Sequence, residues 1–337
     1  MKALLSGVFA SLAVTVFAAD APSFENFSGF QIPPEAGVVW AAATNTSPAA
    51  LWIYKVFPQK FSVSTISNLM ALGSFSWQDE RRKHQNISST NDAPLLFSNR
   101  DRTRTLTIVP DQGWIKYHDE YAPANHWDGI NHLWQTVEKL PGENDIEGLA
   151  LNALAPLGVS RFDLATRPAS PRLLSFGEKR TRSYFDRRDG KYKEDEVILR
   201  GIYFVRKIDG VNFAGTGVAG GSRIDFGNHA KIAELEIVWR NLQPYEHRKI
   251  AGPGEIVRYI HEGKAVMTHR DNVNPTEVKK ITITEVTPFY MGKRGEETQD
   301  FVYPFAQLEA IADLGTTNSP VQLYCPILSQ TRLREEE

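Results

Sequence analysis

The sequence predicts an α+β protein in which two modules, each an amphipathic helix packed on an antiparallel sheet, follow a secretory signal peptide. Segments with apolar residues at helical spacing end in Leu-Gly pairs at 72–73 and 157–158. Segments that alternate β-branched or aromatic residues with polar ones are separated by Gly, Asn and Asp turns. The predicted boundaries are 1–18 for the signal peptide, 19–50 for an extended lead-in, and 51–166 and 176–330 for the two modules.

The first residues are typical of a signal for export. Lys2 precedes an uncharged apolar run that ends in Val16-Phe17-Ala18. A run of about 17 residues is short for a membrane span but suits a secretory signal, which we expect to be cleaved after Ala18. No later stretch of the sequence is apolar enough to span a bilayer. We therefore predict a secreted or periplasmic mature chain.

Composition narrows the class of protein. Of 337 residues, 42% are hydrophobic and 23% charged, which indicates a globular chain. The formal net charge of −2 gives no reason to expect a nucleic-acid partner. Cys325 is the only cysteine, so no intrachain disulfide is possible. It follows an apolar run and is expected to be buried.

The N-terminal module is predicted to begin with a strand over 51–57. Ser62 then has the position of a helix N-cap, and Leu72-Gly73 ends that helix. A second helix is predicted from Asn144, with Glu147 at the capping-box position. Further strands are predicted over 74–77, 94–98, 104–109 and 114–117.

The C-terminal module is predicted around an antiparallel meander over 196–239. Asp209-Gly210 and Gly227-Asn228 are its turns, since both pairs tolerate positive φ. A helix over 255–261 follows, and the remaining strands are predicted over 279–286, 301–311 and 321–328. A segment with prolines at 167–175 is the predicted linker.

The run Tyr203-Phe204-Val205-Arg206-Lys207-Ile208-Asp209-Gly210, with the glycine loop and strand that follow, resembles the hairpin of PepSY and FTP-propeptide modules. The order of helix, hairpin, helix and strand is also similar to that of extracellular two-component-system regulators of the YycI type. The resemblance implies cystatin-like α+β modules. It also implies a non-catalytic role, in which the protein inhibits, chaperones or senses another protein outside the cytoplasm.

The densest group of polar and aromatic residues lies between Trp114 and Trp134. As an active site, it would use His118, Asp119, His126 and Asp128. As a binding surface, it would use Trp114, Tyr117, Trp127 and Trp134. A third interpretation is a loop held on the sheet edge by its own aromatic residues. The histidine spacing matches no common metal motif, and no GxSxG nucleophile accompanies the group.

The other motifs in the sequence do not predict a catalytic or cofactor site. The glycines over 215–221 are followed by a predicted strand, whereas a phosphate cradle requires a helix there. Asn26, Asn45 and Asn86 begin glycosylation sequons. We predict no metal and no cofactor.

The sequence therefore favours a secreted, non-catalytic protein that binds or regulates another extracytoplasmic protein. Two alternatives remain open. One is a secreted hydrolase or accessory biosynthetic enzyme that uses the 114–134 stretch. The other is carbohydrate binding through the tryptophans of the same stretch.

Overall fold

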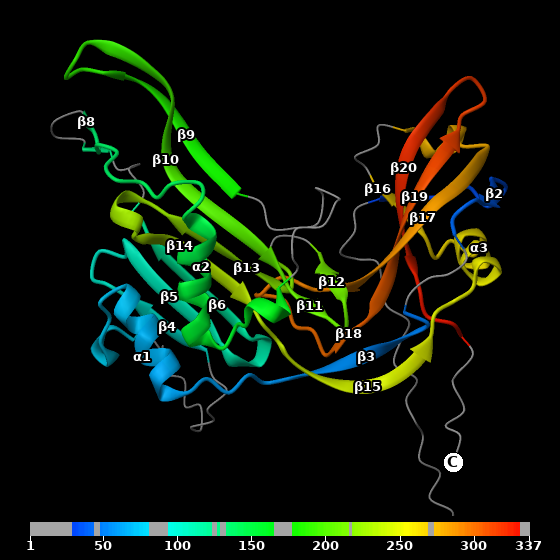
Figure 1. Ribbon diagram of the computed structural model, residues 1–337, viewed down its shortest axis with the longest axis horizontal. Helices are drawn as coiled ribbons and strands as arrows, with labels where there is room; N and C mark the ends of the chain where they lie inside the picture. Colours follow the sequence, from blue (N-terminus) through cyan, green and yellow to red (C-terminus); the bar gives the residue numbers. More distant parts are fainter. Residues whose placement is uncertain are drawn as a thin grey trace, which may run out of the picture.

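The computed structural model describes residues 29–43, 48–80, 94–122, 127–128, 133–164, 177–215, 218–268 and 273–330. It is mostly β, with 49% strand and 18% helix, and the described residues hold three α-helices (Figure 1). The prediction of two α+β, PepSY-like modules of helix plus sheet is therefore wrong. The strands at 177–186 and 241–249 were missed because charged residues, and a proline in the second, mask their alternation.

The first large sheet has seven antiparallel strands. In spatial order they are β4 (Leu95–Ser98), β5 (Arg104–Val109), β6 (Trp114–Asp119), β14 (Ile232–Val238), β13 (Gly221–Phe226), β10 (Lys191–Val205) and β9 (Gly177–Asp186). Three come from before residue 120 and four from after residue 176. The predicted boundaries 51–166 and 176–330 therefore do not separate two sheets, and the predicted linker lies outside the described residues.

Helices α1 (Val63–Leu72) and α2 (Ile146–Leu154) cover one face of this sheet. Both predicted helices are confirmed, but the N-cap of α2 is Asp145 and makes no side-chain hydrogen bond, so the predicted cap at Asn144 with Glu147 is wrong. Ser62 caps α1, since its Oγ accepts a hydrogen bond of 3.0 Å from the Thr65 amide. The chain leaves α2 through a short 3₁₀ turn that ends at Gly158, where φ is +79°.

Strand alternation builds the core under these helices. Leu106, Ile108, Ile115 and Leu235 are at most 2% exposed, and they face α1 and α2. Burying each such side chain contributes about 1.5–3 kcal/mol. The intervening residues of the same strands face the other side of the sheet, where polar side chains predominate.

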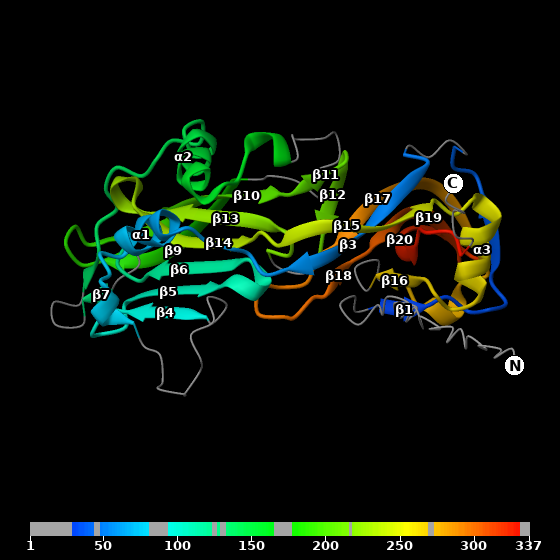
Figure 2. The same cartoon turned by 90° about the horizontal axis from the view of Figure 1, so that it is seen from below.

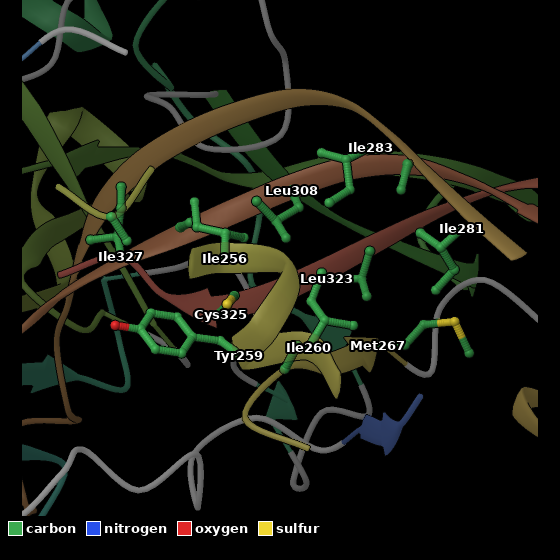
Figure 3. Close-up of a cluster of buried hydrophobic side chains, with 14 of the residues drawn as sticks. Ile256, Tyr259, Ile260, Met267, Ile281, Ile283, Leu308, Leu323, Cys325 and Ile327 are labelled. Atoms are coloured by element: carbon green, nitrogen blue, oxygen red, sulfur yellow. The ribbon is translucent and has the colours of Figure 1, made fainter. Parts of the chain in front are cut away.

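The second large sheet has eight strands. Along its main path they are β1 (Gly29–Gln31), β16 (Val266–Thr268), β20 (Asn318–Pro326), β19 (Pro304–Asp313), β17 (Lys280–Met291), β12 (Val211–Ala214) and β11 (Lys207–Ile208), and β2 (Gly37–Trp40) also pairs with β17. Helix α3 (Pro253–His261) packs on one face, with Ile256 and Ile260 directed at Leu323 and Cys325 (Figure 3). Burial of Cys325 is confirmed, and it raises the pKa of the thiol.

Three strands connect the large sheets. They are β3 (Ala50–Phe57), β15 (Asn241–Lys249) and β18 (Phe301–Val302), in the order β15-β3-β18. They run along the middle of an elongated molecule, with one large sheet at either end (Figure 2). We refer to the place where β10, β12, β14 and β17 meet beside these strands as the junction.

The predicted meander over 196–239 is interrupted. Asp209 and Gly210 do form a tight turn with φ values of +51° and +78°, but it joins β11 to β12 in the second sheet. Strand β10 pairs instead with β9 and β13. Between β10 and β13, which belong to the first sheet, the chain therefore forms β11 and β12 of the second sheet. A local turn signal cannot predict that exchange, because the pairing of β10 with β13 is set by contacts distant in sequence.

Two further differences are local. The predicted strand over 74–77 is a turn followed by a 3₁₀ helix at Trp77–Asp79. A short hairpin of β7 (Trp127–Asp128) and β8 (Leu133–Trp134) follows β6. No helix in the described segments is long and apolar enough to cross a membrane.

Candidate binding surfaces

The structure separates the residues predicted as a catalytic pair. His118 and Asp119 are neighbours on β6, so their side chains point to opposite faces of the sheet. His118 lies across from Glu234 on β14, with 3.7 Å between Nδ1 and Oε1. Asp119 faces the other way, with its Oδ2 at 3.9 Å from Nε of Arg104. Asp119 therefore cannot orient His118 as a base.

The predicted aromatic binding residues are also dispersed. Tyr117 is 1% exposed, and its hydroxyl donates to the carbonyl of Leu72 at 3.1 Å, which makes it a core residue. Burial raises its pKa. Trp114 donates from Nε1 to Glu236 at 3.1 Å and packs so closely against Gly295 that a Cβ there would lie 2.0 Å from its ring. Neither residue offers a free stacking surface.

The remainder of the predicted stretch lies in and around the β7–β8 hairpin. Trp127 pairs with Trp134 and Asp128 with Leu133 in the backbone register. The Trp134 ring meets Tyr184 of β9 edge-on, with 6.3 Å between ring centroids. His126 and the sequon residues Asn26, Asn45 and Asn86 lie outside the described residues. Within the described chain, no group of three or more His, Cys, Asp or Glu side chains could hold a metal ion.

A different candidate surface lies at the edge of the first sheet that is formed by β9 and β10. Strand β10 pairs with β13 only over residues 200–205, but it pairs with β9 over residues 191–202. Over residues 191–199, therefore, β10 pairs with β9 alone, and the two strands form a ribbon that curls away from the body of the molecule (Figure 1). We call residues 179–199 the ribbon. Its signal in the sequence is Asp189-Gly190 between two alternating segments, with φ of +64° at Gly190.

One face of the ribbon is covered and held by paired charges. Arg182 donates from Nε to Glu196 at 2.9 Å and from Nη2 to the Gln135 carbonyl at 2.7 Å. Its guanidinium lies 5.4 Å from the Trp134 ring centroid and 4.6 Å from that of Tyr184. A two-stranded ribbon alone is at best marginally stable in water, so these contacts are what hold it in one conformation.

Asp186 anchors the tip of the same face. It is 2% exposed and accepts three hydrogen bonds from Arg188, one from the backbone N–H at 3.0 Å and two from the guanidinium at 2.9 and 2.7 Å. Lys193 Nζ lies 2.8 Å from the same carboxylate. The hydrogen bonds from Arg188 and Lys193 hold the pKa of Asp186 well below its usual range.

The opposite face of the ribbon is open. Phe185 and Tyr192 are directly paired across the strands and are 58% and 61% exposed. Adjacent exposed aromatic rings are characteristic of interaction surfaces, because each ring keeps a large apolar area in water. The outer edge of β9 has no paired strand in the described part of the chain. Register shifts at 193–196 and 197–199 distort β10, and such bulges limit unspecific edge pairing.

The junction holds a second cluster that the sequence did not indicate. Arg206 follows β10, and its guanidinium lies 4.5 Å from the Trp239 ring centroid and 5.7 Å from that of Phe213. Nearby, the Tyr54 hydroxyl donates to Asp209, and its ring meets Tyr290 edge-on at 5.4 Å. Burial raises the pKa values of both tyrosines. In the sequence these residues are scattered from 54 to 290, so no local pattern could reveal them.

Comparison with known proteins assigns no family. No family model matches the chain, and no curated protein does. One solved structure, an uncharacterized protein from Eubacterium rectale, aligns over 89% of this chain and 90% of its own, with 9% identity and a TM-score of 0.44. At that level of similarity it assigns neither fold nor function.

Proposed function

We propose that the protein is exported and acts without catalysis, by binding another extracytoplasmic protein through the ribbon. The observation that carries this proposal is the exposed Phe185–Tyr192 pair on a projecting element whose other face is fixed. The signal-like run over residues 1–18 supports export. The described part of the predicted 114–134 stretch gives no support to a hydrolase, because His118 and Asp119 face opposite sides of the sheet.

Preorganisation favours the ribbon as a binding element. A flexible hairpin would lose conformational freedom when it bound, and that loss weakens affinity. Here the charged contacts of Arg182 and Asp186 already fix the strands. The aromatic pair is thus presented in a set geometry, and aromatic side chains are frequent hot spots of protein interfaces.

The edge of β9 suggests how the partner binds. An extended segment that paired with β9 would use the backbone N–H and C=O groups of the edge on which no strand of the described chain pairs. It would also lie beside Phe185, whose burial contributes about 1.5–3 kcal/mol. Backbone pairing would give affinity, and the aromatic residues would give specificity.

The proposal is tested by capture of the partner with matched variants. The full-length exported protein is immobilised and exposed to the extracytoplasmic fraction of its own host. The variant Phe185→Ser/Tyr192→Ser is expected to lose a protein that the wild type retains. Tyr245→Ser is the control, since Tyr245 is 47% exposed but lies on β15. Equal capture by all three, or no captured protein, would contradict the proposal.

A further inference from the structure

Arg206 is a fixed cation at the junction. Its Nη1 donates to the carbonyl of Arg240 at 2.7 Å, and Trp239 and Phe213 flank the guanidinium. Its backbone is also held, since its N–H donates to the Gly220 carbonyl at 3.1 Å and its carbonyl accepts from Phe213 at 2.8 Å. The position of the charge is therefore set by both backbone and side-chain contacts.

The remaining donors of Arg206 are unused. Its Nε is enclosed and has no hydrogen-bond acceptor, whereas Nη2 is not enclosed and makes no hydrogen bond within the described chain. No carboxylate of the described residues forms an ion pair with it. Burial lowers its pKa to about 10, although the negative charge of Asp163 acts in the opposite direction. An enclosed N–H without an acceptor destabilises the folded state.

A second buried cation lies beside it. Arg240 is 3% exposed and donates to the carbonyls of Lys293, Arg294 and Glu297 at 2.9, 2.8 and 3.2 Å. Burial lowers its pKa to about 10 as well, and the neighbouring charge of Arg206 contributes. Carbonyl groups accept hydrogen bonds from both terminal nitrogens of Arg240 but not from its enclosed Nε, and they do not neutralise its charge. The junction therefore concentrates two positive charges, neither of which forms an ion pair with a carboxylate of the described chain, although the negative charges of Glu297 and Asp163 act to raise the pKa values of Arg240 and Arg206.

We propose that the junction is an anion site in which Arg206 binds a carboxylate through Nη2, with Trp239 and Phe213 as apolar walls. A planar carboxylate matches a guanidinium held between rings. A tetrahedral phosphate lacks this planar match. The carboxylate is carried either by a small organic acid or by an acidic side chain of a peptide. This site is independent of the ribbon and of the function proposed for it.

The full-length protein allows a direct test, because Trp239 reports on Arg206. Tryptophan fluorescence and thermal unfolding are followed at pH 7 and constant ionic strength while chloride is replaced by acetate, succinate or phosphate. Acetate and succinate are expected to give a saturable fluorescence change and a raised Tm, with phosphate weaker. Arg206→Met is expected to weaken the response about tenfold or more, because it removes a charged hydrogen bond. Lys116→Met, which removes an exposed charge of the first sheet, is expected to leave it unchanged.

Two further arms complete the test. Trp239→Phe, with Arg206 intact, is expected to lose the fluorescence change, so the site remains testable even if Arg206→Met does not fold. A short peptide with one glutamate and an amidated C-terminus identifies the source: a response to the peptide alone points to a partner's side chain, and a response to succinate points to a free acid. Either response supports the site. An equal effect of phosphate, a fluorescence change that persists in Trp239→Phe, or no response to any carboxylate would overturn it.

Discussion

At the ribbon, Arg182 and Asp186 are paired with opposite charges, whereas at the junction Arg206 and Arg240 contact carbonyls and aromatic rings. The first arrangement is complete without a ligand, so it can hold an open aromatic face in position. The second leaves donors unused, so it can accept an anion. The comparison shows that the two clusters of charge serve different purposes: one supports a surface, and the other is itself a candidate site.

The largest effect is expected where an aromatic side chain belongs to the core. Tyr117→Ala should lower the free energy of unfolding by about 3–5 kcal/mol, because it removes a buried ring and its hydrogen bond to the Leu72 carbonyl. Urea denaturation measures the change. A loss below about 1 kcal/mol would mean that Tyr117 is not a core residue.

The next largest effect is expected when Arg240 loses its hydrogen bonds to three carbonyls at the junction. Arg240→Met should destabilise the protein by about 3 kcal/mol or more, since three part-buried carbonyls lose their donor. The surface variant Arg258→Met is the control and should cost no more than about 1 kcal/mol. Similar unfolding midpoints for the two variants would remove the distinction between a buried and an exposed arginine.

The pairing of Asp186 predicts a pH dependence. Its pKa is depressed in the folded state, so its contribution to stability is present above the unfolded pKa of about 3.9 and is lost as the pH falls below it. Asp186→Asn should therefore be less stable than the wild type at pH 7, and the difference should shrink toward pH 3. If the difference in the free energy of unfolding between wild type and Asp186→Asn were the same from pH 7 to pH 3, it would contradict the ion pairing at the tip of the ribbon.

The smallest change in stability is expected on the open face. Phe185→Ser/Tyr192→Ser should alter the free energy of unfolding by about 0.5 kcal/mol or less, because both rings are already in water. Urea denaturation provides the comparison with Tyr117→Ala. A loss similar to that of the core variant would mean that the pair supports the fold and is not reserved for a partner.

The local elements could be predicted from sequence, and their assembly could not. The Ser62 cap, the Leu72-Gly73 ending and the turn at Gly113 depend on neighbours in the chain. Alternation in 114–119 also indicates that Tyr117 shares a face with Ile115, so its place in the core has a signal in the sequence.

Pairing between distant strands accounts for what was missed. In the register of β10 with β13, paired residues lie up to 26 positions apart, and no local signal in the sequence shows that the chain forms β11 and β12 of the second sheet between these two strands. Asp189-Gly190 could have revealed the ribbon. Arg206 and Arg240, however, look like ordinary surface charges in the sequence, and only the fold encloses them.

Site-specific photo-cross-linking tests the role of the ribbon most directly. A photoreactive phenylalanine analogue is placed at position 192 in the full-length protein and, as a matched control, at position 245. After irradiation in the extracytoplasmic environment, position 192 should yield one defined adduct with another protein, and position 245 should yield none. No adduct at 192, or the same adduct at both positions, would contradict the account.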